Sequence, residues 1–562
     1  MANPLFESFS GSDFVENVVM SVDELFPFKE DLNQELHEDV DFLNISYMEV
    51  DLQRILLILK HPANLYFTGS LYVECLSGAV GVHGFTVRPG CDPYFVVSGY
   101  GQSAKCFSSI GDRKISVSLS ELEIELSKRN IFKLFEDQLE QMCAASCVLI
   151  LSKSGDNDLP ILDMFKLPKF QCFEISRNSS FSYFDKLEDW LGCIFDFSSG
   201  SRIPQKMKYD QSIRNLANDC FRWEDPRVMI CGGKGVGKST SLQYLINRMF
   251  EKWSAVVVID FDIGQPEFSI PGCISVNLIQ KPILGPYFNN FYEPLRSIVI
   301  GHVNLDVCLT KYFAAVEELH KYCSLNQDIL NFPWFINTMG YIKGFGLPLI
   351  AKTNFLFNPT HVLQINSSTE PNLNILPLTP ENIHEMLECS VLHNSFSLFD
   401  CDFRIADNYS LISVTAQKLK NPVFVPPRVS REIRVISYMI SNGLSSESVI
   451  ISMKLGHKSQ KEIKHYNRNK VIAICIPYYK RSFMQCVGYG IILEREDDIV
   501  TFQTPVKEDI FLNETDLDIF VLELGLRNSS WDGINLKYPN HDKEHEDIIN
   551  LGNNFSNFDF LF

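Results

Sequence analysis

Residues 227–250 read RVMICGGKGVGKSTSLQYLINRMF, and this stretch decides the fold of the chain. A short apolar run at residues 228–231 enters a glycine-rich turn, and an amphipathic segment leaves the turn from Ser239 onward. This order predicts a strand, a phosphate-binding loop and a helix. The four fixed positions of the P-loop pattern are filled by Gly232, Gly237, Lys238 and Ser239.

The spacing of this loop has a physical cause. Glycines allow successive backbone N–H groups to point into one concavity, where they and the following helix N-terminus hold phosphate oxygens. We expect Lys238 to reach the β- and γ-phosphates of ATP and the Ser239 hydroxyl to ligate Mg²⁺. The alternative is an ordinary glycine turn before a helix. The predicted nucleotide-binding residues are Gly232, Gly233, Lys234, Gly235, Val236, Gly237, Lys238, Ser239 and Thr240.

A second buried strand follows in residues 254–272, SAVVVIDFDIGQPEFSIPG. Strand, helix and strand in this order form the βαβ unit of an open α/β sheet, whose ligands lie beyond the carboxyl ends of the strands. Asp260 and Asp262 stand at such an end in a D-x-D-x-G-Q segment, two residues apart and thus on the same face of an extended chain. We expect one to hold the metal and the other to accept the proton of an attacking hydroxyl. The alternative is an Asp-Gly turn capped by its own side chains.

The composition limits the function classes. The chain has 562 residues with a net charge of -19, which argues against a general electrostatic binder of nucleic acid but allows a local basic groove. Its 16 cysteines form no C-x-x-C pair, and no signal peptide begins the chain, so we expect an intracellular protein with reduced thiols. No apolar run reaches the roughly 18 residues that span a bilayer, so no membrane contact is expected.

The sequence predicts an α/β fold with a central P-loop NTPase domain and a parallel sheet, flanked by N-terminal and C-terminal β-rich domains. Residues 1–50 are acidic and are predicted to form a flexible leader. Residues 51–205 are predicted to form the N-terminal β-rich domain, with hairpins near Gly69 and Gly78. The P-loop domain is assigned to residues 206–420, with about five parallel strands. Residues 421–562 are assigned to a lid, a β-rich domain and a polar tail.

Basic residues recur after the proline-rich exit from the P-loop domain. Arg428, Arg431 and Arg434 share one face of a helix, where they could clamp the charge that develops during phosphoryl transfer. The alternative is a solvated helix face. A second basic run at residues 454–470 fits either an RNA backbone track or an exposed helix.

Two common uses of a P-loop lack their signatures. The chain contains no N-K-x-D segment to read guanine, which argues against a switch GTPase. Lys234 precedes Lys238 by four residues rather than five, which weakens the interpretation as a dimeric ATPase with a second signature lysine.

Several segments resemble the polynucleotide 5′-hydroxyl kinases, a family that includes a nucleolar pre-rRNA-processing kinase and a pre-mRNA cleavage-factor kinase. GGKGVGKST and DFDIGQPE resemble the phosphate and D-x-D-x-G-Q motifs of that family. NTMGYIKGFG resembles its N-T-x-G-W segment, and the arginine row resembles its lid. Outside the kinase core, NLYFTGSLYVECLSGAVGVHGFTV resembles the N-terminal β domain of the nucleolar branch. The resemblance covers residues 52–525 and fits the nucleolar branch better.

The resemblance implies phosphate transfer from ATP to the 5′-hydroxyl of RNA. Asp262 would activate the hydroxyl, and Asp260 would support it and hold Mg²⁺ together with Ser239. The lid arginines would be Arg431 and Arg434. The residues that would contact the RNA are Gln265, Tyr341, which stands where the family has Trp, and Arg428. The resemblance also implies a nuclear, nucleolar protein in pre-rRNA spacer processing and ribosome biogenesis, with an endonuclease as its partner.

The chain departs from the family at two places. Tyr341 replaces the usual Trp, and residues 303–305 lack the small hydroxyl residue and the proline that normally follow the His. These departures leave open an ATP-binding scaffold whose kinase activity has decayed. A P-loop ATPase without a polynucleotide acceptor is a further alternative.

Overall fold

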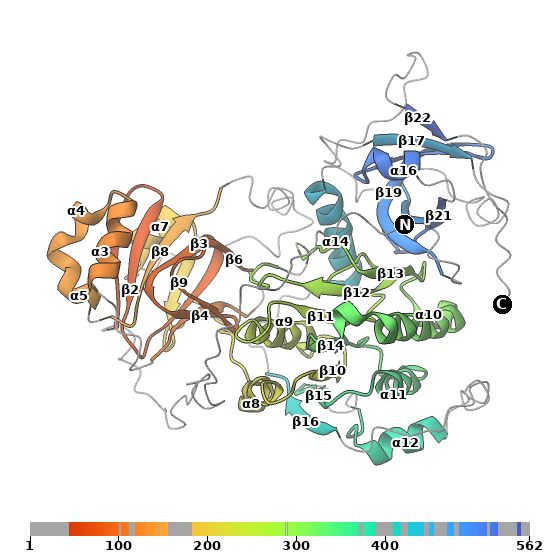
Figure 1. Ribbon diagram of the computed structural model, residues 1–562, viewed down its shortest axis with the longest axis horizontal. Helices are drawn as coiled ribbons and strands as arrows, with labels where there is room; N and C mark the ends of the chain where they lie inside the picture. Colours follow the sequence, from red (N-terminus) through yellow and green to blue (C-terminus); the bar gives the residue numbers. More distant parts are fainter. Residues whose placement is uncertain are drawn as a thin grey trace.

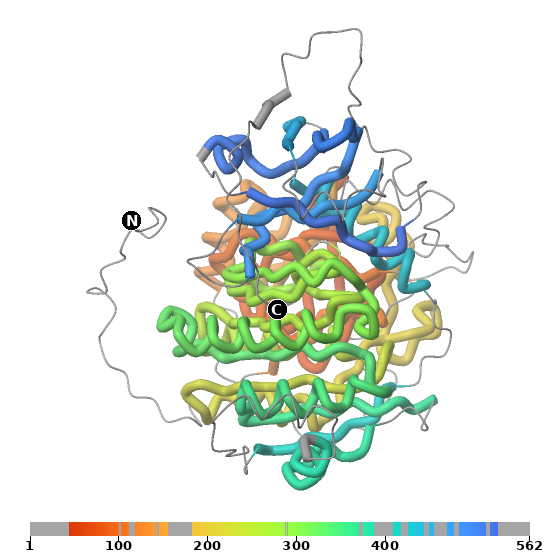
Figure 2. The backbone as a smooth tube through the Cα atoms, turned by 90° about the vertical axis from the view of Figure 1, so that its right-hand side faces the viewer, coloured from red at the N-terminus to blue at the C-terminus, as the bar shows by residue number. Residues whose placement is uncertain are grey.

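In the residues that it describes, the computed structural model contains three β-sheets that follow one another along the chain. In Figure 1 the N-terminal sheet lies at the left, helices flank the central sheet, and the C-terminal sheet lies above it. Figure 2 also places the C-terminal strands above the central helices. The structure describes residues 44–99, 103–111, 119–143, 145–155, 183–286, 288, 290–369, 375–388, 409–417, 425–442, 449–454, 469–476, 483–513, 517–526 and 548–551.

The N-terminal sheet has nine strands in the order β1-β2-β8-β3-β7-β4-β5, with β6 and β9 paired to β3. All of these pairings are antiparallel, as expected for the predicted β-rich region. The strands are β1 (Ile45–Glu49), β2 (Arg54–Leu59), β3 (Asn64–Gly78), β4 (Val80–Val82), β5 (Phe85–Val87), β6 (Tyr94–Ser98), β7 (Lys105–Ser109), β8 (Cys147–Lys153) and β9 (Ile194–Phe197).

Two details of the N-terminal prediction are wrong. β1 pairs with β2 along its whole length, so the sheet begins inside the range predicted as a flexible leader. β3 continues through Gly69, where a hairpin was predicted. Gly69 has a φ of 132°, and a Cβ there would lie 2.6 Å from the Sγ of Cys193. This glycine therefore permits a close approach between neighbouring segments instead of a turn.

Short helices cover the N-terminal sheet. Leu122 and Leu126 of the first helix pack with Leu56, Ile58 and Val148 of the sheet. A helix before β9 contributes to the core on the other side. The elements are α3 (Leu119–Lys128), α4 (Phe132–Phe135), η1 (Glu136–Gln138), α5 (Leu139–Cys143) and α7 (Asp185–Leu191).

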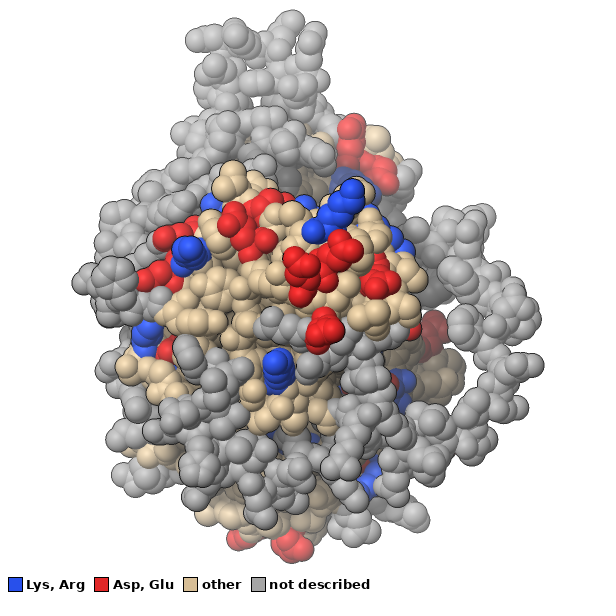
Figure 3. Space-filling view, turned by 90° about the vertical axis from the view of Figure 1, so that its left-hand side faces the viewer, with Lys and Arg blue, Asp and Glu red and all other residues tan. Residues whose placement is uncertain are grey.

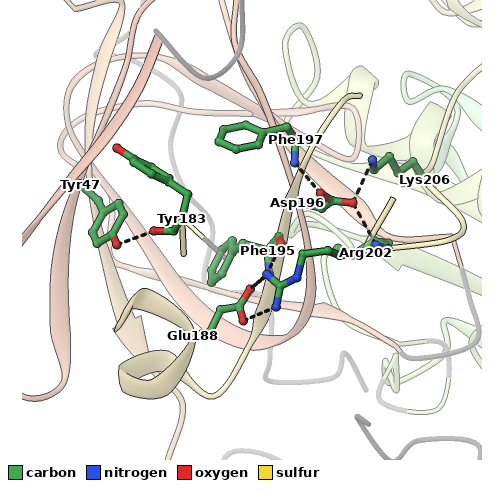
Figure 4. Close-up of polar contacts among 9 residues, drawn as sticks. Tyr47, Tyr183, Glu188, Phe195, Asp196, Phe197, Arg202 and Lys206 are labelled. Carbon is green, nitrogen blue, oxygen red and sulfur yellow. Dashed lines mark hydrogen bonds and ion pairs between the residues drawn. The ribbon is translucent and has the colours of Figure 1, made fainter. Parts of the chain in front are cut away.

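Two buried ion pairs hold the segment by which the chain leaves this domain (Figure 4). The Nη2 of Arg202 lies 2.9 Å from the Oε2 of Glu188 in α7. Asp196 in β9 accepts a 2.9 Å hydrogen bond from the backbone N–H of Ile203 and pairs with Lys206 at 3.1 Å. Both carboxylates are almost fully buried, so water screens these pairs little. The exit from the N-terminal domain is therefore fixed to its sheet.

The central sheet has seven strands in the order β13-β12-β11-β14-β10-β15-β16. Five neighbouring strands, β11, β14, β10, β15 and β16, run parallel, which confirms the α/β fold with a P-loop domain at its centre. The strands are β10 (Arg227–Gly232), β11 (Val256–Asp260), β12 (Cys273–Ile279), β13 (Arg296–Val299), β14 (Trp334–Asn337), β15 (His361–Asn366) and β16 (Ser410–Thr415).

The strands at the two edges of this sheet differ from the prediction. β12 pairs antiparallel with β11, and β13 pairs antiparallel with β12. The sequence did not predict β12, which contains buried Ser275 and Asn277 between its apolar residues. It also missed β16, whose alternating exposure is typical of an edge strand.

Helices pack against both faces of the central sheet. Val228 and Ile230 of β10 face the core formed with α8 and α9, whereas Met229 and Cys231 face the core formed with α10 and α11. This alternation follows the two-residue repeat of a strand. The helical elements are α8 (Gln211–Cys220), α9 (Lys238–Met249), α10 (Leu305–Leu325), η4 (Gln327–Ile329), α11 (Gly346–Phe357) and α12 (Pro380–Glu388).

The C-terminal sheet has six strands in the order β21-β18-β19-β20-β17-β22 and is preceded by α14 (Pro427–Ser441). Its core includes Ile433 and Ile436 of α14 together with Cys273 of β12. The C-terminal domain and the edge of the central sheet therefore share one core. The remaining elements are β17 (Val449–Lys454), β18 (Val471–Ile476), β19 (Gln485–Glu496), β20 (Ile499–Thr504), α16 (Glu508–Asn513), β21 (Asp518–Val521) and β22 (Ile548–Leu551).

Some sequence predictions concern residues outside those that the structure describes. These are the leader up to residue 43, most of the second basic run at 455–468, and the polar tail at 527–547. Within the described part of the chain, no helix has both the length and the apolar character of a membrane span. The cysteines described there are free thiols, most of them buried.

Candidate active site

The phosphate loop joins β10 to α9, as the sequence predicts. Gly235 and Gly237 have φ values of 74° and 96°, which favour glycine at both positions. Gly237 is the N-cap residue of α9, and among the described residues no side chain caps this helix end. The loop therefore presents the N-terminus of a 12-residue helix, the arrangement that holds phosphate groups.

Lys238 begins α9, and its side chain turns back across the loop. Its Nζ donates hydrogen bonds to the carbonyl oxygens of Gly232 at 3.0 Å and Gly233 at 2.8 Å. Burial lowers the pKa of this ammonium group, while the nearby carboxylate of Asp262 acts in the opposite direction. Lys238 and Asp262 thus lie close together at the carboxyl ends of the parallel strands.

The D-x-D-x-G-Q segment turns immediately after β11. The Oδ1 of Asp262 accepts hydrogen bonds from the backbone N–H groups of Gly264 and Gln265, both at 2.9 Å. The Asp-Gly turn that we considered as an alternative is therefore present. It is compatible with a catalytic role, because the cap fixes a half-exposed carboxylate beside Lys238. Gln265 is half-buried in the same turn.

The structure corrects the prediction that Asp260 ligates a metal. Its side chain is 0% exposed, and its Oδ1 accepts hydrogen bonds from the N–H of Asp262 at 3.2 Å and the Nδ2 of Asn337 at 2.9 Å. Its Oδ2 accepts from the N–H groups of Glu267 at 2.7 Å and Phe268 at 3.3 Å. Burial and the charge of Asp262 raise the pKa of Asp260 to about 7. Asp260 shapes the turn instead of facing the loop.

A second buried carboxylate, which the sequence analysis did not single out, lies behind the loop. Glu267 is 2% exposed, and its Oε1 accepts hydrogen bonds from Gln243 and from the Nδ2 of Asn290 at 3.1 Å. The Ser239 hydroxyl lies near this carboxylate and opposes the rise in its pKa. Burial raises the pKa of Glu267, and its donors and the Arg434 guanidinium oppose that shift. The available signal was its place as the last residue of DFDIGQPE.

The arginines of α14 do not share one environment. The side chain of Arg428 is 48% exposed and lies 3.9 Å from Glu432. Arg431 donates from its Nε to the carbonyl oxygen of Leu524 at 2.9 Å. Burial lowers the pKa of Lys234 in the phosphate loop, and the charge of Arg431 lowers it further. Arg431 is therefore near the loop, as a lid residue would be.

Arg434 occupies a different position. Its side chain is 1% exposed and donates from its Nε to the carbonyl oxygen of Ser269 and from its Nη2 to that of Asn290, both at 3.0 Å. Its guanidinium carbon lies 3.9 Å from the ring centroid of Phe291. The predicted common face of the three arginines is wrong for Arg434, because α14 packs that side of the helix into the protein. The alternative interpretation, a solvated helix face, is also wrong for Arg434, because its side chain is buried.

Comparison with known families agrees with this architecture. Residues 43–196 match the family described as "Polynucleotide 5'-hydroxyl-kinase NOL9, N-terminal domain". Residues 232–384 match "mRNA cleavage and polyadenylation factor CLP1 P-loop". The two matches fall on the N-terminal sheet and on the central sheet, in that order. Over these two segments the chain is similar to the polynucleotide 5′-hydroxyl-kinases NOL9 and to the CLP1 P-loop proteins.

Curated relatives carry the same family name. The NOL9 kinase of Drosophila melanogaster is 26% identical over 467 residues, which cover 78% of this chain and 44% of that protein. The human NOL9 kinase is 27% identical over 354 residues, which cover 59% of this chain and 47% of that protein. The chain thus spans less than half the length of these two relatives. A solved Clp1p–Pcf11p complex matches with a TM-score of 0.48 and 12% identity over 84% of this chain and 99% of that chain.

The two departures from the NOL9 family motifs lie close to the site. The hydroxyl of Tyr341 donates to the Oδ1 of Asp306 at 3.2 Å. Its ring lines a small pocket together with Phe261, Tyr312 and Thr338. Phe261 belongs to the D-x-D-x-G-Q segment, so the predicted stacking residue is positioned beside the turn that holds Asp262.

The other departure, at residues 303–305, forms the start of α10. His302 accepts a 2.9 Å hydrogen bond at its Nδ1 from the N–H of Asn304, and the Oδ1 of Asn304 caps the helix by accepting from Asp306. The carbonyl oxygen of Val303 lies 3.8 Å from the place where a Cβ of Gly264 would be. An asparagine cap therefore begins this helix beside the D-x-D-x-G-Q turn, where the family has a hydroxyl residue and proline.

Proposed function

We propose that this chain transfers the γ-phosphate of ATP to the 5′-hydroxyl end of RNA. The observation that carries the proposal is that Lys238 of the P-loop and Asp262 lie at the carboxyl ends of the same parallel strands, near enough for their charges to interact, in a segment similar to the CLP1 P-loop. The loop binds the nucleotide, and the half-exposed carboxylate is available to a second substrate. The names of the curated relatives support a polynucleotide as that substrate.

The residues divide the reaction between them. Backbone N–H groups of the loop and the N-terminus of α9 hold the phosphates, and Lys238 moves from the loop carbonyls to the phosphate oxygens. Asp262 accepts the hydroxyl proton while the 5′-oxygen bonds to the γ-phosphorus and the bond to the β–γ bridging oxygen breaks. ADP then leaves. Arg431, beside Lys234, stabilises the charge on the transferred group.

The donor set near the loop fits Mg²⁺, which prefers oxygen ligands. Ser239 would ligate the ion, and the carboxylate of Asp262 would hold its water molecules. When bound, Mg²⁺ neutralises charge on the β- and γ-phosphates. Asp260 has no place in this set, because its oxygens are already occupied.

The RNA would approach the central domain. The net charge of the chain is -19, and on the face of the N-terminal domain in Figure 3 acidic and basic side chains are interspersed among the described residues. A general electrostatic track on that face is therefore not supported. Tyr341, beside the D-x-D-x-G-Q turn, offers a stacking surface. Exposed Arg428 on α14 offers a positive charge.

In the cell we propose a nuclear, nucleolar role in pre-rRNA spacer processing and ribosome biogenesis. An endonuclease that leaves a 5′-hydroxyl end would supply the substrate. That endonuclease subunit is the proposed protein partner, with the C-terminal β domain as the docking surface. The resemblance to the nucleolar branch supports this assignment.

The proposal is tested with ATP labelled in the γ-phosphate, Mg²⁺ and matched 5′-hydroxyl RNA and DNA oligonucleotides. We expect label on the RNA, and a rate at least about 100-fold lower for Lys238→Ala, which removes the phosphate-binding charge. A wild-type rate no higher than that of Lys238→Ala would overturn the kinase assignment.

The departures at Tyr341 and at residues 303–305 favour a second candidate, a catalytically weak ATP-binding scaffold of an RNA-processing complex. That protein would bind ATP through the same loop and label no RNA. A P-loop ATPase without a polynucleotide acceptor would release free phosphate at a rate that does not respond to 5′-hydroxyl RNA.

A further inference from the structure

The carboxylate of Glu267 lies where three parts of the chain meet behind the phosphate loop. Gln243 of α9 and Asn290 of the segment before β13 both donate to its Oε1. Arg434 of α14 lies near enough to influence the carboxylate and binds the carbonyl oxygen of the same Asn290. All four side chains are at least nine-tenths buried, so the geometry around Glu267 is fixed by packing.

Ser239 lies four residues before Gln243 on α9, and its hydroxyl is close enough to the Glu267 carboxylate to influence it. A serine that ligates a metal through an oxygen lone pair still carries its proton, and that proton needs an acceptor on the side away from the metal. A buried carboxylate is the strongest acceptor available to it. An acceptor at Glu267 would restrict the rotation of this hydroxyl and leave a lone pair for the phosphate side of the loop.

The N-terminal domain supports the same arrangement from outside. The Nε2 of His83, in the turn between β4 and β5, lies 3.1 Å from the Oε1 of Gln243. The carbonyl oxygen of His83 accepts a 2.9 Å hydrogen bond from the Nδ2 of Asn247 on α9. A Cβ at Gly84 would lie 2.7 Å from the backbone of Tyr244, so the turn packs directly on the helix. These contacts fix the amide of Gln243 that donates to Glu267.

We infer that Glu267 is the positioning residue for Ser239, and that the N-terminal domain holds Glu267 in place through His83 and Gln243. The inference rests on the proposed function only in taking the loop as a site for a nucleotide with Mg²⁺. It replaces Asp260, which the D-x-D pattern had indicated for the metal. Partners of metal ligands contribute typically 10–100-fold to metal affinity, even without touching the ion.

The test measures ATP binding with Mg²⁺ and with EDTA, using fluorescence of a labelled ATP analogue displaced by ATP. The wild-type chain should bind ATP more tightly with Mg²⁺. Glu267→Gln should lose about 10-fold of this Mg²⁺-dependent gain, and its affinity in EDTA should stay within about twofold, because the loop amides and Lys238 remain. Gln243→Met should lose a smaller part of this Mg²⁺-dependent gain in ATP affinity. A wild-type Mg²⁺ response in Glu267→Gln would overturn the role of Glu267, and one in Gln243→Met would overturn that of the N-terminal domain.

Glu188→Gln is the matched control, because it also neutralises a buried carboxylate that pairs with an arginine, but in the N-terminal domain (Figure 4). Its Mg²⁺ response should equal that of wild type, and an equal loss there would assign the effect to general destabilisation. If Glu267→Gln does not fold, Glu267→Asp retracts the carboxylate and keeps its charge, with the same expected direction. The changes should not add in Ser239→Ala/Glu267→Asp, because Ser239→Ala already lacks the hydroxyl. The readout is nucleotide binding, so failure to phosphorylate RNA would overturn the proposed function and leave this inference standing.

Discussion

The two sides of the phosphate loop contain the same types of charged residue in opposite surroundings. On the solvent side, the lysine, aspartate and arginine are partly exposed, whereas on the inner side the carboxylates and the arginine are buried with their hydrogen bonds made. The solvent-side group is Lys234, Asp262 and Arg431, and the inner group is Asp260, Glu267 and Arg434.

This difference separates the residues that can take part in the reaction from the residues that support the structure around them. A partly exposed charge can meet a substrate, because it gives up little when it exchanges water for the ligand. A buried carboxylate with filled lone pairs cannot accept a new partner without losing an existing one. Removing a residue from the solvent side should therefore reduce catalysis directly, and removing one from the inner side should reduce local stability or the positioning of the loop.

The largest expected difference is between the two aspartates. Asp262→Asn should lower the rate of phosphate transfer by about 10²–10⁴-fold, because it removes the proton acceptor, with little change in thermal stability. Asp260→Asn should cost about 1–3 kcal/mol, because an amide group must face the donors that now bind a carboxylate. Parallel transfer assays and melting curves separate the two. Equal losses of rate and stability in both variants would contradict the division.

The arginines of α14 give the next comparison. Arg434→Met should reduce the protection of α14 in hydrogen exchange by about 3 kcal/mol, because Glu267 and two backbone carbonyls lose a buried partner. Arg431→Ala should leave this protection almost unchanged and lower phosphate transfer. Full exchange protection of α14 in Arg434→Met would show that its burial does not support the helix.

The folding stability of the chain should depend on pH through His83, which lies in the turn between β4 and β5. Burial, together with the charge of Lys105, lowers the pKa of His83 to about 3 from the usual 6.5. The unfolded chain therefore binds a proton that the folded chain does not, and stability falls as the pH drops below 6.5. At pH 5 the loss is about 2 kcal/mol. Thermal unfolding at pH 7 and pH 5 measures it, and His83→Gln should remove this share of the pH dependence; an unchanged dependence would refute the assignment.

The smallest expected effect concerns Tyr341. Tyr341→Ala should weaken the apparent affinity for RNA by about 10-fold through loss of a stacked base, and Tyr341→Trp should strengthen it by less than about fivefold. Tyr341→Phe keeps the ring without the bond to Asp306 and serves as the control. Transfer rates measured against RNA concentration test this, and equal affinities for all three variants would exclude stacking.

Local patterns were sufficient to predict part of this molecule. The loop from Gly232 to Thr240, the strands on either side of it and the place of Asp262 follow from glycine spacing and from apolar runs. The antiparallel β12 and the edge strand β16 were missed, because buried Ser275 and Asn277 interrupt the apolar pattern of β12 and most residues of β16 are partly or fully exposed.

The inner layer of the site could not be predicted in the same way. Asp260 and Asp262 look equivalent in the sequence, but only the first remains in β11, where Asn337 of the neighbouring strand binds it. The role of Glu267 depends on its hydrogen bonds with Gln243 and Asn290, which are 24 and 23 residues away in the chain. The burial of Arg434 depends on tertiary packing of α14, which a three-residue spacing does not contain.

We propose that Lys238 and Asp262 direct the γ-phosphate to an RNA end. A single-turnover reaction with labelled ATP and excess enzyme tests it most directly, by measuring how the label divides between RNA and free phosphate. We predict that 5′-hydroxyl RNA takes most of the label and that RNA already phosphorylated at its 5′-end takes none. Label released as free phosphate at the same rate with either RNA would contradict the claim.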